Sequence, residues 1–277
     1  MTACRSPSLE EVAGFYDLFT PMMRLIWDDN IHFGFWADDG DASSVGQATD
    51  RLTDLVVEHI AAGPGSRLLD VGCGVGKPAL RLARATGAEV IGISINHREV
   101  EEASRRAWAE GPADRVSFRF ADAMALPFPH ESFDGAFALE SILHMDRPVA
   151  LREMARVLKV GGRLVLTDIF QKAPLPEELQ PAAAEARDAQ KLSPLPEFGD
   201  FEPMVREAGF DVEVLRDISS QTGSTLPRIG QGIQQKWEAI QQALGPEARR
   251  VLQSLASPVA SLPEFGYALL VACRRGA

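Results

Sequence analysis

The sequence predicts an α/β fold in which helices cover both faces of a mostly parallel β-sheet. Strand and helix patterns alternate along the chain from Arg67 to Thr167. Alternation of this kind produces a parallel sheet, because each crossover helix returns the chain to the same edge. The chain has 277 residues, of which 45% are hydrophobic and 24% charged. It is therefore long enough to bury a large core and has the composition of an ordinary globular protein.

Seven stretches have the hydrophobic pattern of strands. They cover residues 67–71, 89–93, 116–120, 133–138, 163–167, 210–215 and 266–272. Helices are expected over residues 77–86, 98–110, 149–158, 201–208 and 229–244. Gly161 and Gly162 are interpreted as the stop signal of the third of these helices. Further helical segments are expected in the first 60 residues and between Pro174 and Pro196.

Charge and cysteine content exclude several classes of protein. The net charge of −11 argues against binding to nucleic acid or anionic membranes, which requires a basic surface. Cys4, Cys73 and Cys273 form no CxxC pair, so neither a disulfide framework nor a zinc site is expected. No apolar run resembles a signal peptide or a membrane span. The sequence therefore predicts a cytoplasmic protein without a bound metal ion.

The most informative motif follows the first strand. Asp70-Val-Gly-Cys-Gly-Val-Gly76 places glycines at alternate positions between a strand and a helix. Glycines allow close approach of the backbone to a ligand, and the helix start offers unpaired N–H groups. A dinucleotide-binding loop has the spacing G-x-G-x-x-G and binds a pyrophosphate. The G-x-G-x-G spacing departs from that pattern, and the preceding acid would repel a pyrophosphate. A plain strand–turn–helix connection is the remaining alternative.

This motif resembles the first motif of the class I methyltransferases, which bind S-adenosylmethionine (SAM). The resemblance implies a Rossmann-like, seven-stranded sheet and SAM as the cofactor. The residues that it places at the methionine end of SAM are Asp70, Gly72, Cys73, Gly74 and Gly76.

Two further positions correspond to the family's adenosine site. Residues 120–128 resemble the adenine motif, which implies that Asp122 accepts from the adenine amino group and that the backbone of Ala123 meets the ring. Many members hold the ribose hydroxyls with an acid after the second strand, where this chain has Ser94. In a subset with a neutral residue there, a glutamine five residues later can approach the ribose, and Glu99 occupies that position. Glu99 is alternatively a solvated charge on a helix.

Most of the chain is similar to the natural-product methyltransferases typified by the rebeccamycin sugar O-methyltransferase. The similarity is carried by residues 27–36, 76–80, 92–95 and 138–145. It implies one domain over residues 1–277, with an N-terminal helical lid (1–60), a SAM-binding core (61–170), an acceptor-covering segment (171–235), and a C-terminal helix and last strand (236–277). A helical insertion is expected between strands five and six. Near the cofactor or its lid the resemblance places Tyr16, Trp27, His32 and Trp36.

The same resemblance identifies candidate catalytic residues. The sugar enzyme has two adjacent histidines after strand four, of which the second corresponds to His144 and the first is replaced by Leu143. His144 is a candidate base because imidazole titrates near neutrality. Asp168 corresponds to an aspartate after strand five and is a candidate to orient His144 or to position the acceptor. Glu140 lies on the same rim and is a further candidate for the cofactor site.

Three functions fit these residues. The leading prediction is O-methylation of a sugar or polyketide hydroxyl on a small-molecule natural product. N- or C-methylation is the second, because a neutral amine needs no strong base and one histidine is missing. The third is ring closure without methyl transfer, as in relatives such as the spinosyn cyclase that keep SAM bound; Leu143 and an apolar cover would suit it. The oligomeric state stays open.

Overall fold

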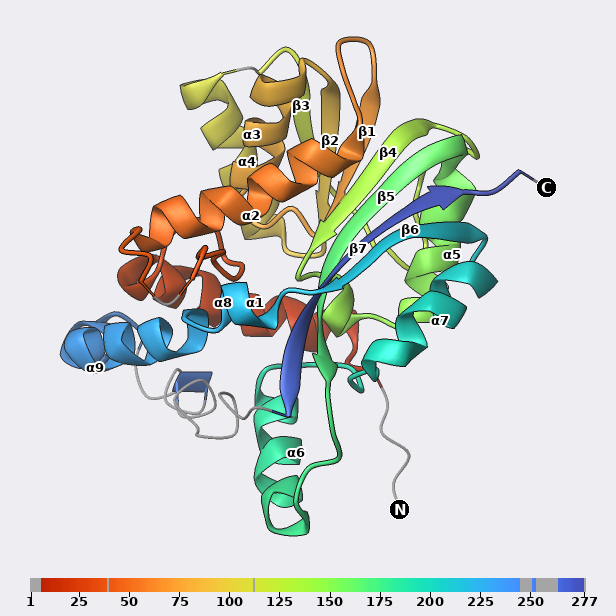
Figure 1. Ribbon diagram of the computed structural model, residues 1–277. Helices are drawn as coiled ribbons and strands as arrows, with labels where there is room; N and C mark the ends of the chain where they lie inside the picture. The colour runs from red at the N-terminus through yellow and green to blue at the C-terminus, as the bar shows by residue number, and fades with distance from the viewer. Residues whose placement is uncertain (1–5, 39, 112, 245–250, 253–263, 277) are drawn as a thin grey trace.

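The computed structural model describes residues 6–38, 40–111, 113–244, 251–252 and 264–276. In these residues seven strands form one sheet in the order β3-β2-β1-β4-β5-β7-β6 (Figure 1). Only β7 runs antiparallel to its neighbours among the described strands. The strands are β1 (Arg67–Val71), β2 (Glu89–Ser94), β3 (Val116–Phe120), β4 (Phe133–Leu139), β5 (Leu158–Gln171), β6 (Phe210–Asp217) and β7 (Phe265–Arg274). The predicted mostly parallel sheet is confirmed.

Helices cover both faces of this sheet (Figure 1). Successive strand side chains point to opposite faces, so Leu68 belongs to one hydrophobic core while Leu69 and Val71 belong to the other. The core around Leu69 is closed by α5 (Arg147–Val157) and α7 (Phe201–Glu207). The core around Leu68 is closed by α2 (Val45–Ile60), α3 (Lys77–Thr86) and α4 (His97–Glu110). The two cores hold the sheet rigid at the rim where the strands end.

Polar caps determine where the helices near this rim begin. In α1 (Leu9–Ile26), the Ser8 hydroxyl accepts from the Glu11 N–H at 3.3 Å, and the Glu11 carboxylate accepts from the Ser8 N–H at 2.8 Å. This reciprocal arrangement is a capping box. The Asn96 side chain accepts from the N–H groups of Arg98 and Glu99 at the start of α4. The cap of α4 thereby orients Glu99 toward the end of β2.

The prediction that Gly161 and Gly162 stop a helix is wrong. α5 begins at Arg147, after the Asp146 cap, and ends at Val157, and β5 already begins at Leu158. A Cβ on Gly162 would lie 2.8 Å from the Lys159 carbonyl oxygen and 3.0 Å from that of Asp134. Gly162 therefore permits a close approach of two backbones where the β4–β5 register shifts. Gly161 has φ +79° and open space around it, so it serves the left-handed turn of the backbone instead. Burial of Leu158 against β4 outweighs the helical propensity of this stretch.

The segments outside the core gather in the lower half of Figure 1. There, α1 packs on α9 (Thr225–Leu244) through Phe15, Met22 and Met23, which contact Ile229 and Ile233. The predicted helix in the segment that follows strand five is observed as α6 (Gln180–Ala189), and α8 (Ser219–Thr222) precedes α9. Of the predicted C-terminal segment, residues 245–250 and 253–263 lie outside the described residues.

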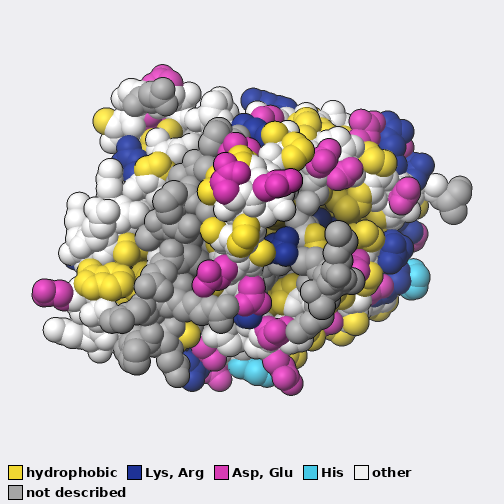
Figure 2. All heavy atoms as spheres, turned by 90° about the horizontal axis from the view of Figure 1, so that it is seen from below, with side chains coloured by type: hydrophobic (Ala, Val, Ile, Leu, Met, Phe, Trp, Pro, Cys, Tyr) yellow, Lys and Arg dark blue, Asp and Glu magenta, His cyan; other side chains and the backbone are white. Residues whose placement is uncertain are grey.

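Acidic side chains are scattered over the face of the molecule seen from below, with hydrophobic ones between them (Figure 2). This distribution agrees with the net charge of −11. None of the described helices combines the length and the apolar character needed to cross a bilayer.

The structure explains one glycine of the loop after β1 by packing. Gly76 has φ +84°, and a Cβ there would lie 2.6 Å from Phe118 Cζ and 2.9 Å from Ala103 Cβ. We expect Gly76→Ala to lower the free energy of unfolding by about 3 kcal/mol, through left-handed backbone strain and overpacking. Urea denaturation followed by circular dichroism measures this loss.

Gly65 offers a matched control, because its φ is +87° and a Cβ there would meet no heavy atom within 4 Å. Gly65→Ala should cost only the backbone strain, about 1 kcal/mol. Equal losses in the two variants would show that packing against Phe118 is not the reason for a glycine at position 76.

Candidate functional site

A narrow cleft opens where β1, β2 and β4 end beneath α1. It is lined by eleven of the fourteen residues expected near the cofactor or its lid. These are Tyr16, His32, Asp70, Gly72, Cys73, Gly74, Ser94, Glu99, Asp122, Ala123 and Glu140. Gly76, Trp27 and Trp36 do not line it, because each contacts other parts of the chain.

A different structural constraint requires glycine at each of the three glycine positions after β1. A Cβ on Gly72 would lie 2.2 Å from Ser141 Cβ, so Gly72 allows β1 and β4 to approach each other. A Cβ on Gly74 would meet no heavy atom within 4 Å, and its backbone has φ +49°. Gly74 therefore leaves open space on the cleft, where a ligand can reach the backbone. Gly76 packs against β3 and α4, as described above.

Asp70 is a buried carboxyl with an unpaired oxygen. Asp70 is 2% exposed, and its Oδ2 has no hydrogen-bond partner among the described residues. Burial raises the pKa of Asp70 well above its usual value. Leaving such a group without a partner is costly, so the cleft is suited to a ligand that brings a cation or a hydrogen-bond donor. The ammonium group of SAM meets this requirement, whereas a pyrophosphate does not.

Glu99 is buried rather than solvated. Its two oxygens accept hydrogen bonds from the Ser94 hydroxyl at 2.8 Å and from the Thr20 hydroxyl of α1 at 2.9 Å. Burial raises the pKa of Glu99 despite these two donors. The interpretation of Glu99 as a surface charge is therefore wrong. Thr20 was not singled out from the sequence, although it lies one helical turn after Tyr16 and so shares its face.

Asp122 lies across the cleft from this pair of residues, after β3. Its Oδ1 accepts from the Met124 N–H at 2.8 Å, which closes a local turn. This turn holds the backbone of Ala123 at the cleft wall, and Ala123 itself is 3% exposed. The arrangement presents a carboxylate and a small side chain side by side, as a flat heterocycle with an exocyclic amino group requires.

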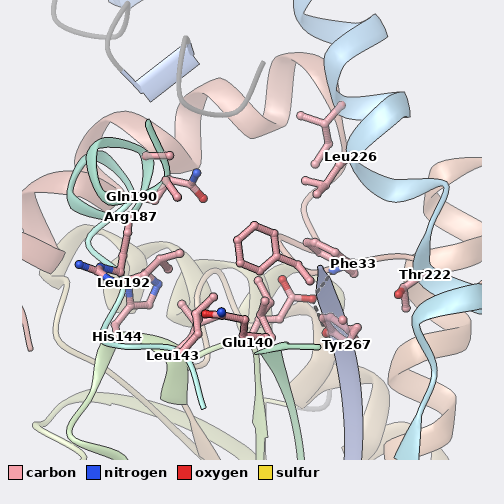
Figure 3. Close-up of a pocket in the computed structure, with 18 of the residues that line it drawn as sticks. Phe33, Glu140, Leu143, His144, Arg187, Gln190, Leu192, Thr222, Leu226 and Tyr267 are labelled. Atoms are coloured by element: carbon pink, nitrogen blue, oxygen red, sulfur yellow. Dashed lines mark hydrogen bonds between the residues drawn. The ribbon is translucent and has the colours of Figure 1, made fainter. Parts of the chain in front are cut away.

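A second, larger cavity of about 710 Å³ adjoins the cleft. Its wall comes from α1, α6, α9, the residues before α2 and the beginning of β7 (Figure 3). The lining is mainly apolar and includes Phe15, Phe19, Met23, Leu143, Leu175, Ala183, Leu192, Leu226 and Ile229. Five residues line both cavities, namely Tyr16, Ile31, His32, Glu140 and His144. The two cavities thus meet at a small group of polar side chains.

His144 is held in one orientation at this junction. It follows β4 in the short helix η1 (Ile142–His144) and is 8% exposed. Its Nδ1 lies 2.7 Å from the Lys191 carbonyl oxygen, which can only accept, so Nδ1 carries the proton. Its Nε2 therefore accepts from the Tyr16 hydroxyl, at 2.8 Å. Burial lowers the pKa of His144 to about 4, so the ring is neutral at pH 7 and Nε2 offers a lone pair.

Glu140 occupies the other side of the junction. It has φ +52°, an uncommon conformation for a residue other than glycine, which turns the chain sharply after β4. Its Oε1 accepts from the Phe33 N–H and from the Tyr267 hydroxyl, as the dashed lines in Figure 3 show. Burial raises the pKa of Glu140 to about 8, so the carboxyl is mostly protonated at pH 7. Glu140 thereby joins the segment before α2 to β7 at the cavity wall.

Two expected site residues have structural partners instead. Asp168, predicted to orient His144 or to position the acceptor, is fully buried in an ion pair with Arg147, and it neither contacts His144 nor lines either cavity. Both ring nitrogens of His144 have other partners. Trp36 is 2% exposed, its indole N–H donates to the Ser43 carbonyl at 3.2 Å, and the Arg228 guanidinium lies 5.0 Å from its ring centre. Trp36 contacts α9 through Arg228 and lines neither cavity.

Comparison with known proteins agrees with this geometry. Residues 69–166 match the model of a methyltransferase domain family. The methyltransferase GfsG of Streptomyces halstedii is 37% identical over 263 residues, which cover 95% of this chain and 93% of the relative. The 27-O-demethylrifamycin SV methyltransferase of Amycolatopsis mediterranei is 37% identical over 268 residues, which cover 96% and 97% of the two chains.

A solved structure is similar over the full length. The [4+2]-cyclase SpnF has a TM-score of 0.87 and 33% sequence identity, with 100% of each chain covered. The fold, the alternate glycines, the unpaired Asp70 and the relatives all lead to one conclusion. The chain belongs to the class I methyltransferases, and its cofactor is SAM.

Proposed function

We propose that this protein transfers the methyl group of SAM to a hydroxyl group of a bulky natural product, with His144 as the general base. The observation that supports this most strongly is the position of His144. It lines both the cleft and the large cavity, and its Nε2 offers a lone pair at their junction. A base at this place lies between the expected sites of the methyl donor and of the acceptor.

In this proposal, different residues of the cleft bind the different chemical groups of SAM. Asp70 Oδ2 would receive the ammonium group, and the open space beside Gly74 would admit the methionine chain. Ser94 and Glu99 would face the ribose, and Asp122 with Ala123 the adenine. The bound cofactor supplies an electrophilic methyl group on a good leaving group. Alignment by the protein can then contribute about 7–11 kcal/mol to the lowering of the barrier.

His144 acts on the acceptor in this proposal. The acceptor hydroxyl takes the place of Tyr16 as the donor to Nε2, and its proton passes to Nε2 as the oxygen is methylated. A positioned base of this kind contributes about 10²–10⁴-fold. The low pKa of His144 keeps Nε2 unprotonated at neutral pH. Leu143 lines the cavity and leaves His144 as the single histidine of η1.

The large cavity supports a natural product as the acceptor. A volume of about 710 Å³ is in the range of small-molecule sites, and its mainly apolar lining suits a large hydrophobic skeleton. The names of the relatives supply the chemistry, because one of them methylates an oxygen of a rifamycin precursor. A polyketide or sugar hydroxyl is therefore the proposed target, in preference to nitrogen or carbon.

Ring closure without methyl transfer is the second candidate, because the chain is 33% identical to a [4+2]-cyclase. The two functions differ in their products. Incubation with SAM and a panel of polyketides and glycosides should yield an O-methylated product and an equal amount of S-adenosylhomocysteine, measured by mass spectrometry. Consumption of a polyene without S-adenosylhomocysteine would contradict methyl transfer and indicate the cyclase. An N- or C-methylated product would contradict the choice of oxygen.

Gly74 provides a test of the cofactor site. Gly74→Val places a branched side chain in the open space of the cleft, so we expect SAM affinity to fall more than about tenfold, or 1.4 kcal/mol. Isothermal titration calorimetry with SAM measures the change. Gly65→Val is the control, because Gly65 has a positive φ but lies in the turn before β1. Unchanged SAM affinity in Gly74→Val would show that the cofactor binds elsewhere.

His144→Gln tests the base. Glutamine can accept the hydrogen bond from Tyr16 but cannot take a proton, so turnover should fall about 10²-fold or more while the SAM dissociation constant stays within about twofold. The exposed His130 provides the control variant His130→Gln, which should retain turnover. Retained turnover in His144→Gln would show that His144 is not the base.

The pH dependence of kcat/KM gives an independent readout of the same residue. Because the folded-state pKa of His144 is lowered to about 4, its neutral form persists as the pH falls through 6.5. The acidic limb of the profile should therefore be centred near pH 4, with folding monitored by circular dichroism. A limb that follows the pKa of an acceptor amine would instead indicate N-methylation.

A further inference from the structure

A buried ion pair lies behind the wall of the large cavity. Arg147, the first residue of α5, and Asp168 of β5 have side chains that are 5% and 0% exposed. Two contacts join them, from Arg147 Nε to Oδ2 at 2.6 Å and from Nη2 to Oδ1 at 3.1 Å. The Ile169 N–H also donates to Oδ1, at 2.8 Å. A buried pair of this kind often adds nothing to stability compared with apolar residues, so its presence calls for another explanation.

Arg147 has a third partner, which belongs to the cavity wall. Its Nη1 donates to the Pro194 carbonyl oxygen at 2.8 Å. We name residues 191–194 the cover strip; Leu192 and Pro194 of this strip line the cavity. The cover strip is joined to η1 as well, because the Ser193 N–H donates to the Leu143 carbonyl at 2.8 Å. Asp168 thus orients the Arg147 guanidinium group, which binds the cover strip at Pro194.

The near end of the cover strip carries the group that sets the proton on His144. Lys191 has φ +55°, an uncommon conformation for a residue other than glycine. In this conformation its carbonyl oxygen lies 2.7 Å from His144 Nδ1. Neutral imidazole exists in two forms that differ in which nitrogen carries the proton, and the partner of Nδ1 selects between them. A strained turn keeps its geometry only when the neighbouring contacts hold it.

We propose that Asp168 and Arg147 are positioning residues for His144, which they influence through the cover strip. The ion pair holds Pro194, the strip then presents the Lys191 carbonyl, and that carbonyl keeps the proton on Nδ1 so that Nε2 is free to act as the base. This inference rests on the proposed function of His144. Asp168 then influences the protonation of His144, although Asp168 contacts neither His144 nor either cavity.

The test uses the full-length protein and the ¹⁵N NMR signals of the histidine rings at pH 7. His144→Gln identifies the His144 signals by their loss. In the unaltered protein we expect a single form with the proton on Nδ1. In the double variant Arg147→Met with Asp168→Leu, which replaces the pair by apolar side chains of similar size, we expect a mixture of the two forms. For an assayable acceptor, kcat should fall about tenfold with little change in the KM for SAM, a smaller loss than removal of the base itself.

Arg163 provides the matched control. It also lies on β5, five residues before Asp168. It forms an ion pair with Glu213 at 2.8 Å and donates to the His59 carbonyl at 2.8 Å. Arg163→Met should leave the His144 signals unchanged. A folded double variant in which His144 keeps the proton on Nδ1 would overturn the proposal.

A second variant keeps the proposal falsifiable if the double variant does not fold. Arg147→Lys retains the charge beside Asp168, but one ammonium group cannot replace the planar fork that reaches both the carboxylate and Pro194. It should also give a mixture of the two forms, and an unchanged ring would again overturn the proposal. The NMR result does not depend on catalysis. A mixture of forms together with unchanged methyl transfer would therefore refute His144 as the base and leave the positioning role intact.

Discussion

The contact between the ends of β1 and β4 is the constraint on which the site depends. Gly72 leaves room for the Ser141 side chain, and the Ser141 hydroxyl donates to the Val71 carbonyl. Because the two turns touch, the loop that carries Asp70 and Gly74 lies directly beside the turn that carries Glu140 and His144. A larger residue at position 72 would separate the cleft from His144. The sheet thus joins two sites that come from segments about 70 residues apart in the chain.

Burial of ionisable groups is concentrated around this contact. The carboxyl groups of Glu99, Glu140 and Asp168 accept hydrogen bonds from residues of other helices and strands. One carboxyl oxygen of Asp70 has no partner among the described residues. Each of these groups would be more stable in water, so their burial is better explained by ligand binding and positioning than by stability of the fold. The helix α1 contributes to both sites, because Thr20 binds Glu99 and Tyr16 binds His144. Helix α1 therefore lines both the cleft and the large cavity.

Much of the core could be predicted from the sequence. Five of the seven strands begin where their hydrophobic pattern begins, and the loop of alternate glycines does line the cleft. The exceptions have physical reasons. Gly161 serves a left-handed turn and Gly162 a close approach of β4 and β5, which local propensity cannot distinguish from the end of a helix. Trp36 has the residue type and the place of a lid aromatic, but its burial depends on α9, almost 200 residues later.

The sequence by itself determined the fold class and the cofactor and predicted twelve of the 27 residues that line the cleft, because hydrophobic period and glycine spacing are local properties of the chain. Only the tertiary structure decided which partners His144 and Asp168 have. The proton on His144 depends on a carbonyl group 47 residues away, and the partner of Asp168 is an arginine on a helix packed beside its strand. A carbonyl group carries no signature in the sequence, and the partner of a buried charge is set by which surfaces pack together.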